Sequence, residues 1–220
     1  MTWEKLLPLL WKSIGETLYM TFTASVIAYA IGLPLGVLLV VTRKDSIMPH
    51  PSLNTVLGVI INFLRSIPFI IMLALLFPVT RAIVGTAVGT TAVIFPLIIS
   101  AFPYIARMVE GSLEEVDHGI IEAAQSMGST NWQIIYKVLL PEATPSLING
   151  AAISITTILG YTAMASAAGG GGLGSLAIVK GLNVRKYDVM YSASILLVLL
   201  VQIITVFGTR VMRSLDHKKR

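Results

Sequence analysis

The sequence predicts an all-α membrane protein, and three observations lead to this fold class. The chain has 220 residues, of which 55% are hydrophobic and only 12% charged, whereas soluble domains average about 25% charged residues. Its mean hydropathy is +0.82. Five long stretches are nearly free of charge, and each can form a helix across a hydrocarbon core of about 30 Å, which takes roughly 20 residues. We therefore expect five transmembrane helices.

Runs without charge set the expected limits of these helices. The five expected spans are residues 17–42, 54–80, 82–106, 143–168 and 189–209. Gly32 and Gly36 in the first span have the small-xxx-small spacing that lets helix backbones approach closely in lipid. Gly85 and Gly89 in the third span have the same spacing, so close helix packing is expected at both places.

The distribution of Lys and Arg gives the expected orientation. With the N-terminus outside, nine basic residues fall on the cytoplasmic side and six on the outer side, and cytoplasmic loops carry the excess of Lys and Arg. Five of the nine lie near the C-terminus: Arg210, Arg213, Lys218, Lys219 and Arg220. We therefore expect a cytoplasmic C-terminus, and we attribute the net charge of +5 to membrane anchoring rather than to nucleic-acid binding.

The chain offers few residues with which to do chemistry. It has no cysteine and three widely separated histidines, so we expect no metal site and no cofactor. All eleven acidic residues fall at or beyond the ends of the expected spans, which weighs against an ion-coupled carrier, because such carriers use titratable groups inside the membrane. There is no Gly-Lys dipeptide and hence no phosphate-binding P-loop. We expect no enzymatic activity and no ATP hydrolysis by this chain alone.

Residues 169–174 match the G-x-G-x-x-G pattern of dinucleotide-binding proteins. The context differs from such a site, because an expected membrane helix precedes the glycines and the next acidic residue is Asp188. We interpret them instead as a glycine-rich break between helices, which permits close packing or a re-entrant turn.

Arg65 is the one charge inside an expected span, and Pro68 follows it closely. Proline removes a backbone donor, so a kink is expected there. Arg65 lies roughly 16 Å into the span at 1.5 Å per residue. Two roles remain open from the residues alone: pairing with backbone carbonyls that Pro68 frees, or gating and substrate contact.

The polar segment 108–141 is predicted to begin with a short amphipathic helix. Apolar residues recur at helical spacing from Ile120 to Met127, after a group of acidic residues that favours a helix start. Gly128 suits a left-handed position at the end of this helix. We therefore expect a helix followed by a glycine turn.

A second helix is predicted to follow this turn. Thr130 can cap it, with Gln133 three residues later completing a capping box, and Pro141 is expected to stop it. On spacing alone, a surface hairpin that covers the ends of the spans explains the segment equally well.

The residues of this segment resemble the EAA signature of permease subunits in bacterial ABC importers. The matching order is Glu122-Ala123-Ala124, then Gly128, then Val138, Leu140 and Pro141, with valine where the signature usually has isoleucine. Further stretches are similar to permeases of methionine-uptake ABC transporters. These stretches are residues 65–70, 106–110, 133–135, 137–143, 160–164 and 171–174.

This resemblance implies a type I ABC importer permease whose single transmembrane domain covers residues 1–220. It further implies a homodimer in the lipid bilayer, a dimer of ATP-binding subunits below it and an extracytoplasmic substrate-binding protein. Ala123 and Ala124 would lie with Glu122 on the helix that docks on the ATPase, and their small side chains suit close approach to that partner. Gly128 would make the turn, and Leu140 and Pro141 would close the signature.

Arg65, from its charge inside a span, and Tyr161 and Met164, by the same resemblance, are candidates for the substrate path. Helix packing explains Tyr161 and Met164 equally well. An ATP-driven importer of an amino acid, most simply methionine, is the leading hypothesis. The alternatives are an ion-coupled secondary carrier and a membrane scaffold or enzyme without transport activity.

Overall fold

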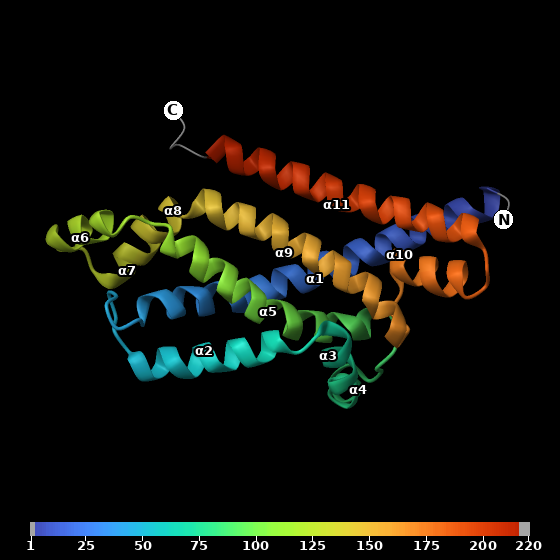
Figure 1. The fold of residues 1–220 in the computed structure, drawn as a ribbon, viewed down its shortest axis with the longest axis horizontal. Helices are drawn as coiled ribbons and strands as arrows, with labels where there is room; N and C mark the ends of the chain where they lie inside the picture. Colours follow the sequence, from blue (N-terminus) through green and yellow to red (C-terminus); the bar gives the residue numbers. More distant parts are fainter. Residues whose placement is uncertain (1–2, 216–220) are drawn as a thin grey trace. The chain divides into compact units, whose positions relative to one another are not determined.

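The computed structural model of the chain describes residues 3–215, and these residues fold into helices without any strand. Figure 1 shows their order along the chain. The α-helices are α1 (Trp3–Val41), α2 (Pro51–Ser66), α3 (Phe69–Leu75), α4 (Phe77–Val84), α5 (Thr90–Glu114), α6 (His118–Ser126), α7 (Asn131–Ile134), α8 (Leu140–Glu142), α9 (Thr144–Met164), α10 (Gly172–Ser175) and α11 (Tyr187–Leu215). Two π-helices (Ile135–Leu139 and Leu176–Leu182) and a 3-10 turn (Ala165–Ala168) connect some of them.

Among residues 3–215, four helices are long and apolar enough to cross a membrane. They are Leu6–Val41, Thr90–Glu114, Thr144–Ala168 and Tyr187–Ser214. The second expected span is a pair, α2 and α3, that passes the same test only together and is bent by 99° at the break between them. Pro68 stands at this break as the N-cap of α3, so the expected kink is a complete interruption of the helix. Five spans result when the pair is counted as one.

The third expected span differs most from the structure. It was expected to begin at Ala82, but α4 ends at Val84 and the next long helix starts at Thr90. Gly85 and Gly89 have φ angles of 83° and 108°, and a Cβ at either position would meet nothing within 4 Å. These two glycines therefore form a turn, and the prediction that they pack helices together is wrong.

Two compact units make up the chain. The first contains residues 1–28, 67–101 and 154–205, and the second contains residues 29–66, 102–153 and 206–220. In the first unit, Leu6 and Leu10 of α1 form a buried cluster with Leu173, Val189 and Ala193. The second unit has a small cluster of Leu39, Ile61 and Ala106, which joins α1, α2 and α5.

The glycines of α1 allow α5 to approach closely in the second unit. A Cβ at Gly32 would lie 2.9 Å from the carbonyl oxygen of Phe102, and a Cβ at Gly36 would lie 2.6 Å from that of Ala106. Such distances leave no room for a side chain, so the expected small-xxx-small packing is confirmed here.

The glycine-rich break of the first unit packs against α1. The amide of Gly172 donates to Glu16 Oε2 at 2.7 Å, and the amide of Leu173 donates to Thr17 Oγ1 at 2.9 Å. A Cβ at Gly171 would lie 2.3 Å from Glu16 Oε2. Close packing therefore explains these glycines. Glu16 thus lies at the edge of the first expected span, residues 17–42, inside the longer helix Leu6–Val41.

Candidate coupling site

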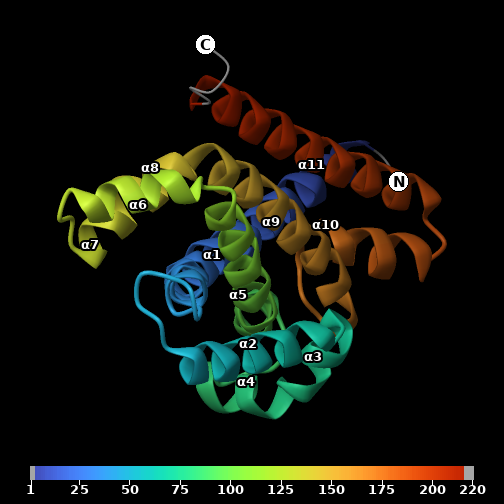
Figure 2. The same cartoon turned by 60° about the vertical axis from the view of Figure 1, so that its left-hand side comes forward.

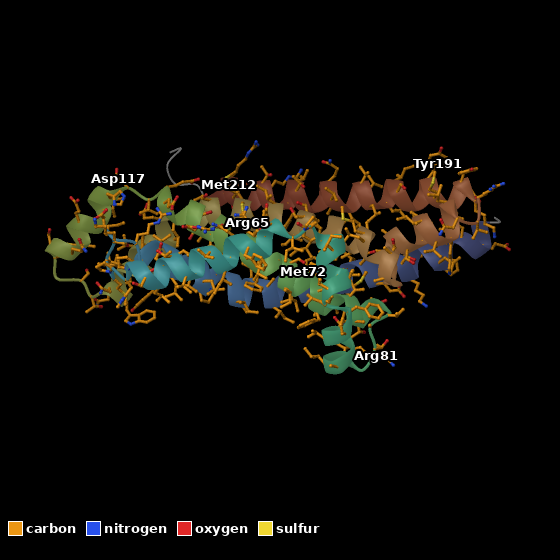
Figure 3. All side chains as sticks on the ribbon, turned by 60° about the horizontal axis from the view of Figure 1, so that its bottom comes forward. Arg65, Met72, Arg81, Asp117, Tyr191 and Met212 are labelled. Atoms are coloured by element: carbon orange, nitrogen blue, oxygen red, sulfur yellow. The ribbon has the colours of Figure 1, made fainter. Side chains whose placement is uncertain are left out.

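The helix that carries Glu122 begins with a side-chain cap. Asp117 has an extended backbone, and its carboxylate accepts a hydrogen bond from the amide of Gly119 at 2.7 Å. Aspartate at this position satisfies one of the free amides of a first turn and favours the positive end of the helix dipole. Figure 3 shows Asp117 at this end of the second unit. Helix α5 runs on to Glu114, so the connection between α5 and α6 is short.

Gly128 ends this helix in the way expected from the sequence. Its φ angle is 79°, and its amide donates to the carbonyl of Gln125 at 2.9 Å. The amide of Ser129 donates to the carbonyl of Ala124 at 3.1 Å. These two bonds form a Schellman motif, in which a left-handed residue follows the last helical turn. Because a Cβ at Gly128 would meet nothing within 4 Å, glycine is favoured here by the backbone conformation and not by lack of space.

The second helix starts as predicted but does not stop as predicted. Thr130 Oγ1 accepts from the amide of Gln133 at 3.4 Å, and Gln133 Oε1 accepts from the amide of Thr130 at 2.8 Å, which confirms the capping box. Pro141, however, lies inside the short helix α8, directly after the π-helix Ile135–Leu139. The wider turn of a π-helix shifts the hydrogen-bond register and so accommodates a residue that lacks an amide hydrogen. Leu140 and Pro141 thus continue the helical path.

Helix α6 presents most of its surface to the outside of the chain. Glu122 and Ala123 are exposed, whereas Ala124 is only 4% exposed. The two small residues therefore have different surroundings. Ala123 is free to meet a partner, but the close approach that Ala124 permits is to this chain itself. Of the two alanines predicted to suit the partner, Ala123 is the one that this chain leaves open.

A buried ionic network lies beside this site, and sequence reasoning did not find it. Glu110 on α5 is 6% exposed. Its Oε1 accepts from Arg43 Nη2 at 2.8 Å, and its Oε2 accepts from Arg107 Nη1 at 2.5 Å. Arg107 also donates to the carbonyl of Gly58 at 3.3 Å, and Arg43 pairs with Glu114. One buried carboxylate therefore links the end of α1 with α2 and α5.

A hollow of about 940 Å³ separates this network from α6. Arg43 and Glu114 line it on one side, and Glu122 and Gln125 of α6 line it on the other. Figure 2 shows α6 and α7 beside the end of α5. Glu122 is thus exposed at the surface and also lines a hollow of mixed polar and apolar character inside the second unit.

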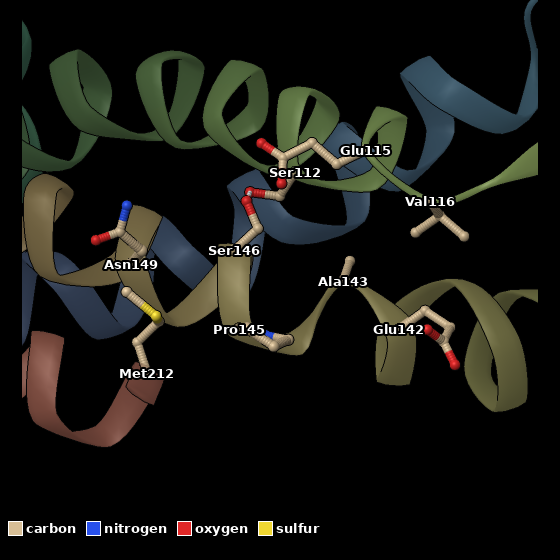
Figure 4. Close-up of a pocket in the computed structure, with 9 residues that line it drawn as sticks. All are labelled: Ser112, Glu115, Val116, Glu142, Ala143, Pro145, Ser146, Asn149 and Met212. Atoms are coloured by element: carbon tan, nitrogen blue, oxygen red, sulfur yellow. Dashed lines mark hydrogen bonds between the residues drawn. The ribbon is translucent and has the colours of Figure 1, made fainter. Parts of the chain in front are cut away.

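A smaller pocket of about 320 Å³ lies between α5, α9 and α11 in the same unit. Figure 4 shows its lining, with Glu115 and Glu142 on different sides and the hydroxyls of Ser112 and Ser146 joined by a hydrogen bond of 3.2 Å. Its carboxylates make it suited to positively charged groups. Within residues 3–215, no group of three or more potential metal-ligating side chains comes together.

The three candidates for the substrate path have different surroundings. Tyr161 stacks on Phe69, with ring centroids 4.8 Å apart and planes 5° from parallel, and Met164 is 51% exposed. Both belong to the first unit, whereas Arg65 belongs to the second. Arg65 is exposed at the end of α2 (Figure 3). It makes no hydrogen bond or ion pair with residues 3–215, so the expected pairing with freed carbonyls is not observed.

The basic residues near the C-terminus are described only in part. Arg210 and Arg213 lie on α11. Lys218, Lys219 and Arg220, on which the expected orientation partly depends, lie outside the described residues.

The sequence profile of one family, described as "Binding-protein-dependent transport system inner membrane component", matches residues 32–220. The chain belongs to this family. Members of the binding-protein-dependent family are the inner membrane component of a transport system, so the chain is a membrane transport subunit and not an enzyme.

Two relatives within this family carry more specific names. The chain is 47% identical over 215 residues to the probable D-methionine transport system permease protein MetI of Pasteurella multocida, covering 96% of this chain and 99% of that protein. It is 49% identical over 160 residues to the D-methionine transport system permease protein MetI of Escherichia coli K12, covering 71% and 74%.

Solved structures agree with this assignment to the binding-protein-dependent family. An inward-facing conformation of the MetNI methionine ABC transporter contains a chain that matches with a TM-score of 0.96 and 46% identity, over 99% of this chain and 100% of that one. An amino acid ABC transporter with histidines matches with a TM-score of 0.74 and 21% identity, over 97% of this chain and 95% of that one. The second likeness shows the fold alone.

Proposed function

We propose that the chain is the permease subunit of an ATP-driven importer that moves methionine across the cytoplasmic membrane by alternating access. The agreement with a chain of the MetNI methionine ABC transporter carries this proposal, because 46% identity accompanies a TM-score of 0.96 over 99% of the chain. The names of the relatives from Pasteurella and Escherichia support the same substrate.

The chain acts in this proposal as a homodimer with two ATP-binding subunits and an extracytoplasmic binding protein. Helix α6 docks on the ATP-binding subunit through its exposed side, which includes Glu122 and Ala123. Ala124 anchors α6 to its own chain, and Gly128 sets the direction in which the chain leaves the helix. Leu140 and Pro141 carry the helical path on to the turn at Ala143, after which α9 begins. Movement of the ATPase pair then reaches the membrane helices as a rigid-body displacement.

The docking site and the C-terminus face the cytoplasm in this proposal, and the N-terminus faces outward. The excess of basic residues on the side of α6 supports this orientation. All residues from 1 to 220 serve as one transmembrane domain.

Arg65, Tyr161 and Met164 are proposed to contact the substrate on its path. Arg65 is exposed and lacks a partner within residues 3–215, so its guanidinium is free to hold a carboxylate. Met164 offers an exposed thioether to an apolar side chain. Tyr161 stacks on Phe69. This contact holds the Tyr161 ring in place, which supports a role in the fixed wall of the path rather than in a mobile gate.

Methionine uptake by reconstituted vesicles tests the proposal. The permease together with its ATP-binding subunits and binding protein should accumulate labelled methionine only when ATP is supplied. A variant that lacks the catalytic base of the ATP-binding subunit is the matched control. Uptake by this chain alone under an ion gradient would contradict the proposal and favour a secondary carrier.

A further inference from the structure

Two aromatic side chains project from the segment that follows the docking helix. Trp132 is 72% exposed and Tyr136 is 56% exposed. They are four residues apart on the continuous helical path of α7 and the π-helix Ile135–Leu139, so both point to the same side. We refer to Trp132 and Tyr136 as the aromatic face.

The other side of this segment is also apolar. Ile134, Ile135 and Leu139 are all 7% exposed or less and pack into the chain. A helix that is apolar on two sides needs an apolar neighbour on each side, unlike a surface helix with one polar side. Residues 3–215 leave the aromatic face largely uncovered, so a neighbour other than these residues can pack against it.

The docking helix α6 has a different surface. Its exposed side carries the polar residues Glu122, Gln125 and Ser126 together with Ile120 and, at its C-cap, Met127, and such a mixed surface without an exposed Trp, Tyr or Phe suits contact with another protein. The aromatic face instead combines the two residue types that are enriched where membrane meets water, because each has an apolar ring with a polar end. Lys137 Nζ lies 5.9 Å from the Tyr136 ring centroid, where a lysine can extend toward lipid phosphates.

The position of the aromatic face relative to a membrane helix favours lipid as its neighbour. Tyr136 precedes Thr144, the first residue of the membrane-spanning helix α9, by eight residues, or about 12 Å of helix. Figures 1 and 2 both show the chain turning sharply between α8 and α9. The segment thus leaves the axis of α9 at this turn, within eight residues of the start of that helix. The headgroup layer on each side is about 5–8 Å thick.

We propose that the aromatic face is a membrane anchor. Trp132 and Tyr136 lie among the lipid headgroups at the membrane surface where α9 begins, with Lys137 beside the lipid phosphates. The anchor fixes one end of the segment that contains α6, so the docking helix moves against a fixed point. This surface is separate from the proposed contact with the ATP-binding subunit.

Fluorescence quenching by brominated lipids tests the anchor. The chain has three tryptophans, so the double variant Trp3→Phe with Trp11→Phe leaves Trp132 as the only one. It is reconstituted, with and without ATP-binding subunits, in phosphatidylethanolamine and phosphatidylglycerol vesicles that contain brominated phosphatidylcholine. Bromines near the headgroups should remove about half of the Trp132 emission, and bromines near the bilayer centre should remove less. A second variant that keeps only Trp11, which is 71% exposed on α1, calibrates the quenching.

Two results would overturn the anchor. If brominated lipids leave the Trp132 emission unchanged, this side chain lies in water. If the quenching disappears when the ATP-binding subunits are added, Trp132 lies at the contact with those subunits.

Spin labels give an independent measurement that does not depend on tryptophan variants. The chain has no cysteine, so Tyr136→Cys and Met127→Cys each introduce a single labelling site. Met127 is the matched control, since it is 79% exposed at the end of α6. The label at position 136 should collide more with oxygen, which dissolves in lipid, and the label at 127 more with a water-soluble nickel complex. Equal access of the nickel complex to both labels would reject the anchor.

Discussion

Replacing Glu110 by glutamine removes the charge at the centre of the buried network while keeping the size of the side chain. The Glu110 side chain is 7% exposed, and its two oxygens bond to Arg43 and Arg107. Removing one partner of a buried ion pair costs about 3–5 kcal/mol, because the opposite charge is left without compensation. Arg107 is 24% exposed and loses its carboxylate partner, whereas Arg43 is 47% exposed and still has Glu114. The lower end, about 3 kcal/mol, is therefore expected for Glu110→Gln.

Thermal unfolding of the purified chain in detergent measures this loss. For a chain of this size, each kcal/mol lowers Tm by about 2–4 °C, so Glu110→Gln should lower it by about 6–12 °C. Glu114→Gln is the matched control: it breaks the pair with Arg43, in which the side chains are 40% and 47% exposed. Surface pairs contribute about 0–1 kcal/mol. If both variants melt at the same temperature, the buried network does not hold α1, α2 and α5 together as argued.

Three further predictions concern the docking segment and the α1–α5 contact. Gly128→Val should abolish ATP-driven uptake while leaving the chain inserted, because a β-branched residue is strained at a φ of 79°. Gly128→Asn should retain most uptake, because asparagine tolerates the left-handed conformation. An equal loss of uptake in both variants would show that backbone conformation is not the cause. Gly36→Ala should destabilise the chain by about 1–3 kcal/mol in thermal unfolding, whereas Gly111→Ala, where a Cβ meets nothing within 4 Å, should not. Ala123→Trp should weaken binding of the ATP-binding subunit with little change in Tm. Ala124→Trp should instead lower the Tm of the chain. If Ala124→Trp weakens binding without lowering Tm, Ala124 lies at the partner contact.

The local features of the docking segment could be predicted from the sequence because each depends on neighbouring residues. The capping box joins Thr130 to Gln133, and the left-handed turn needs only a glycine at position 128 after the last helical turn. The effect of Pro141 was predicted wrongly for a related reason. A proline is expected to end a helix, but the π-helix before it changes the hydrogen-bond register, and residue propensities do not reveal such a change.

The features that sequence reasoning missed depend on residues far apart in the chain. Glu110 meets Arg43 across 67 positions, and Glu16 meets Gly172 across 156. Hydropathy predicts the start of a span from the local run of uncharged residues. The first expected span therefore begins just after Glu16, although α1 begins at Trp3 and includes this residue. The sequence offered one signal for the contact between Glu16 and Gly172. Glu16 is an acidic residue beside a long apolar stretch, and consecutive glycines at 169–172 leave room for such a side chain.

The different burial of Ala123 and Ala124 indicates how a movement of α6 can reach the membrane helices. Ala124 is the one buried residue of α6, and its carbonyl also accepts the bond from Ser129 that closes the turn. A displacement of α6 therefore acts at Ala124 on the side chains that pack over it and, through the turn, on α7. Next to α6, Glu110 binds α1 and α5 together through ion pairs rather than through apolar contacts alone. Charged hydrogen bonds have narrow geometric limits, so in the proposed mechanism we expect these helices to move as one body, as alternating access requires of them.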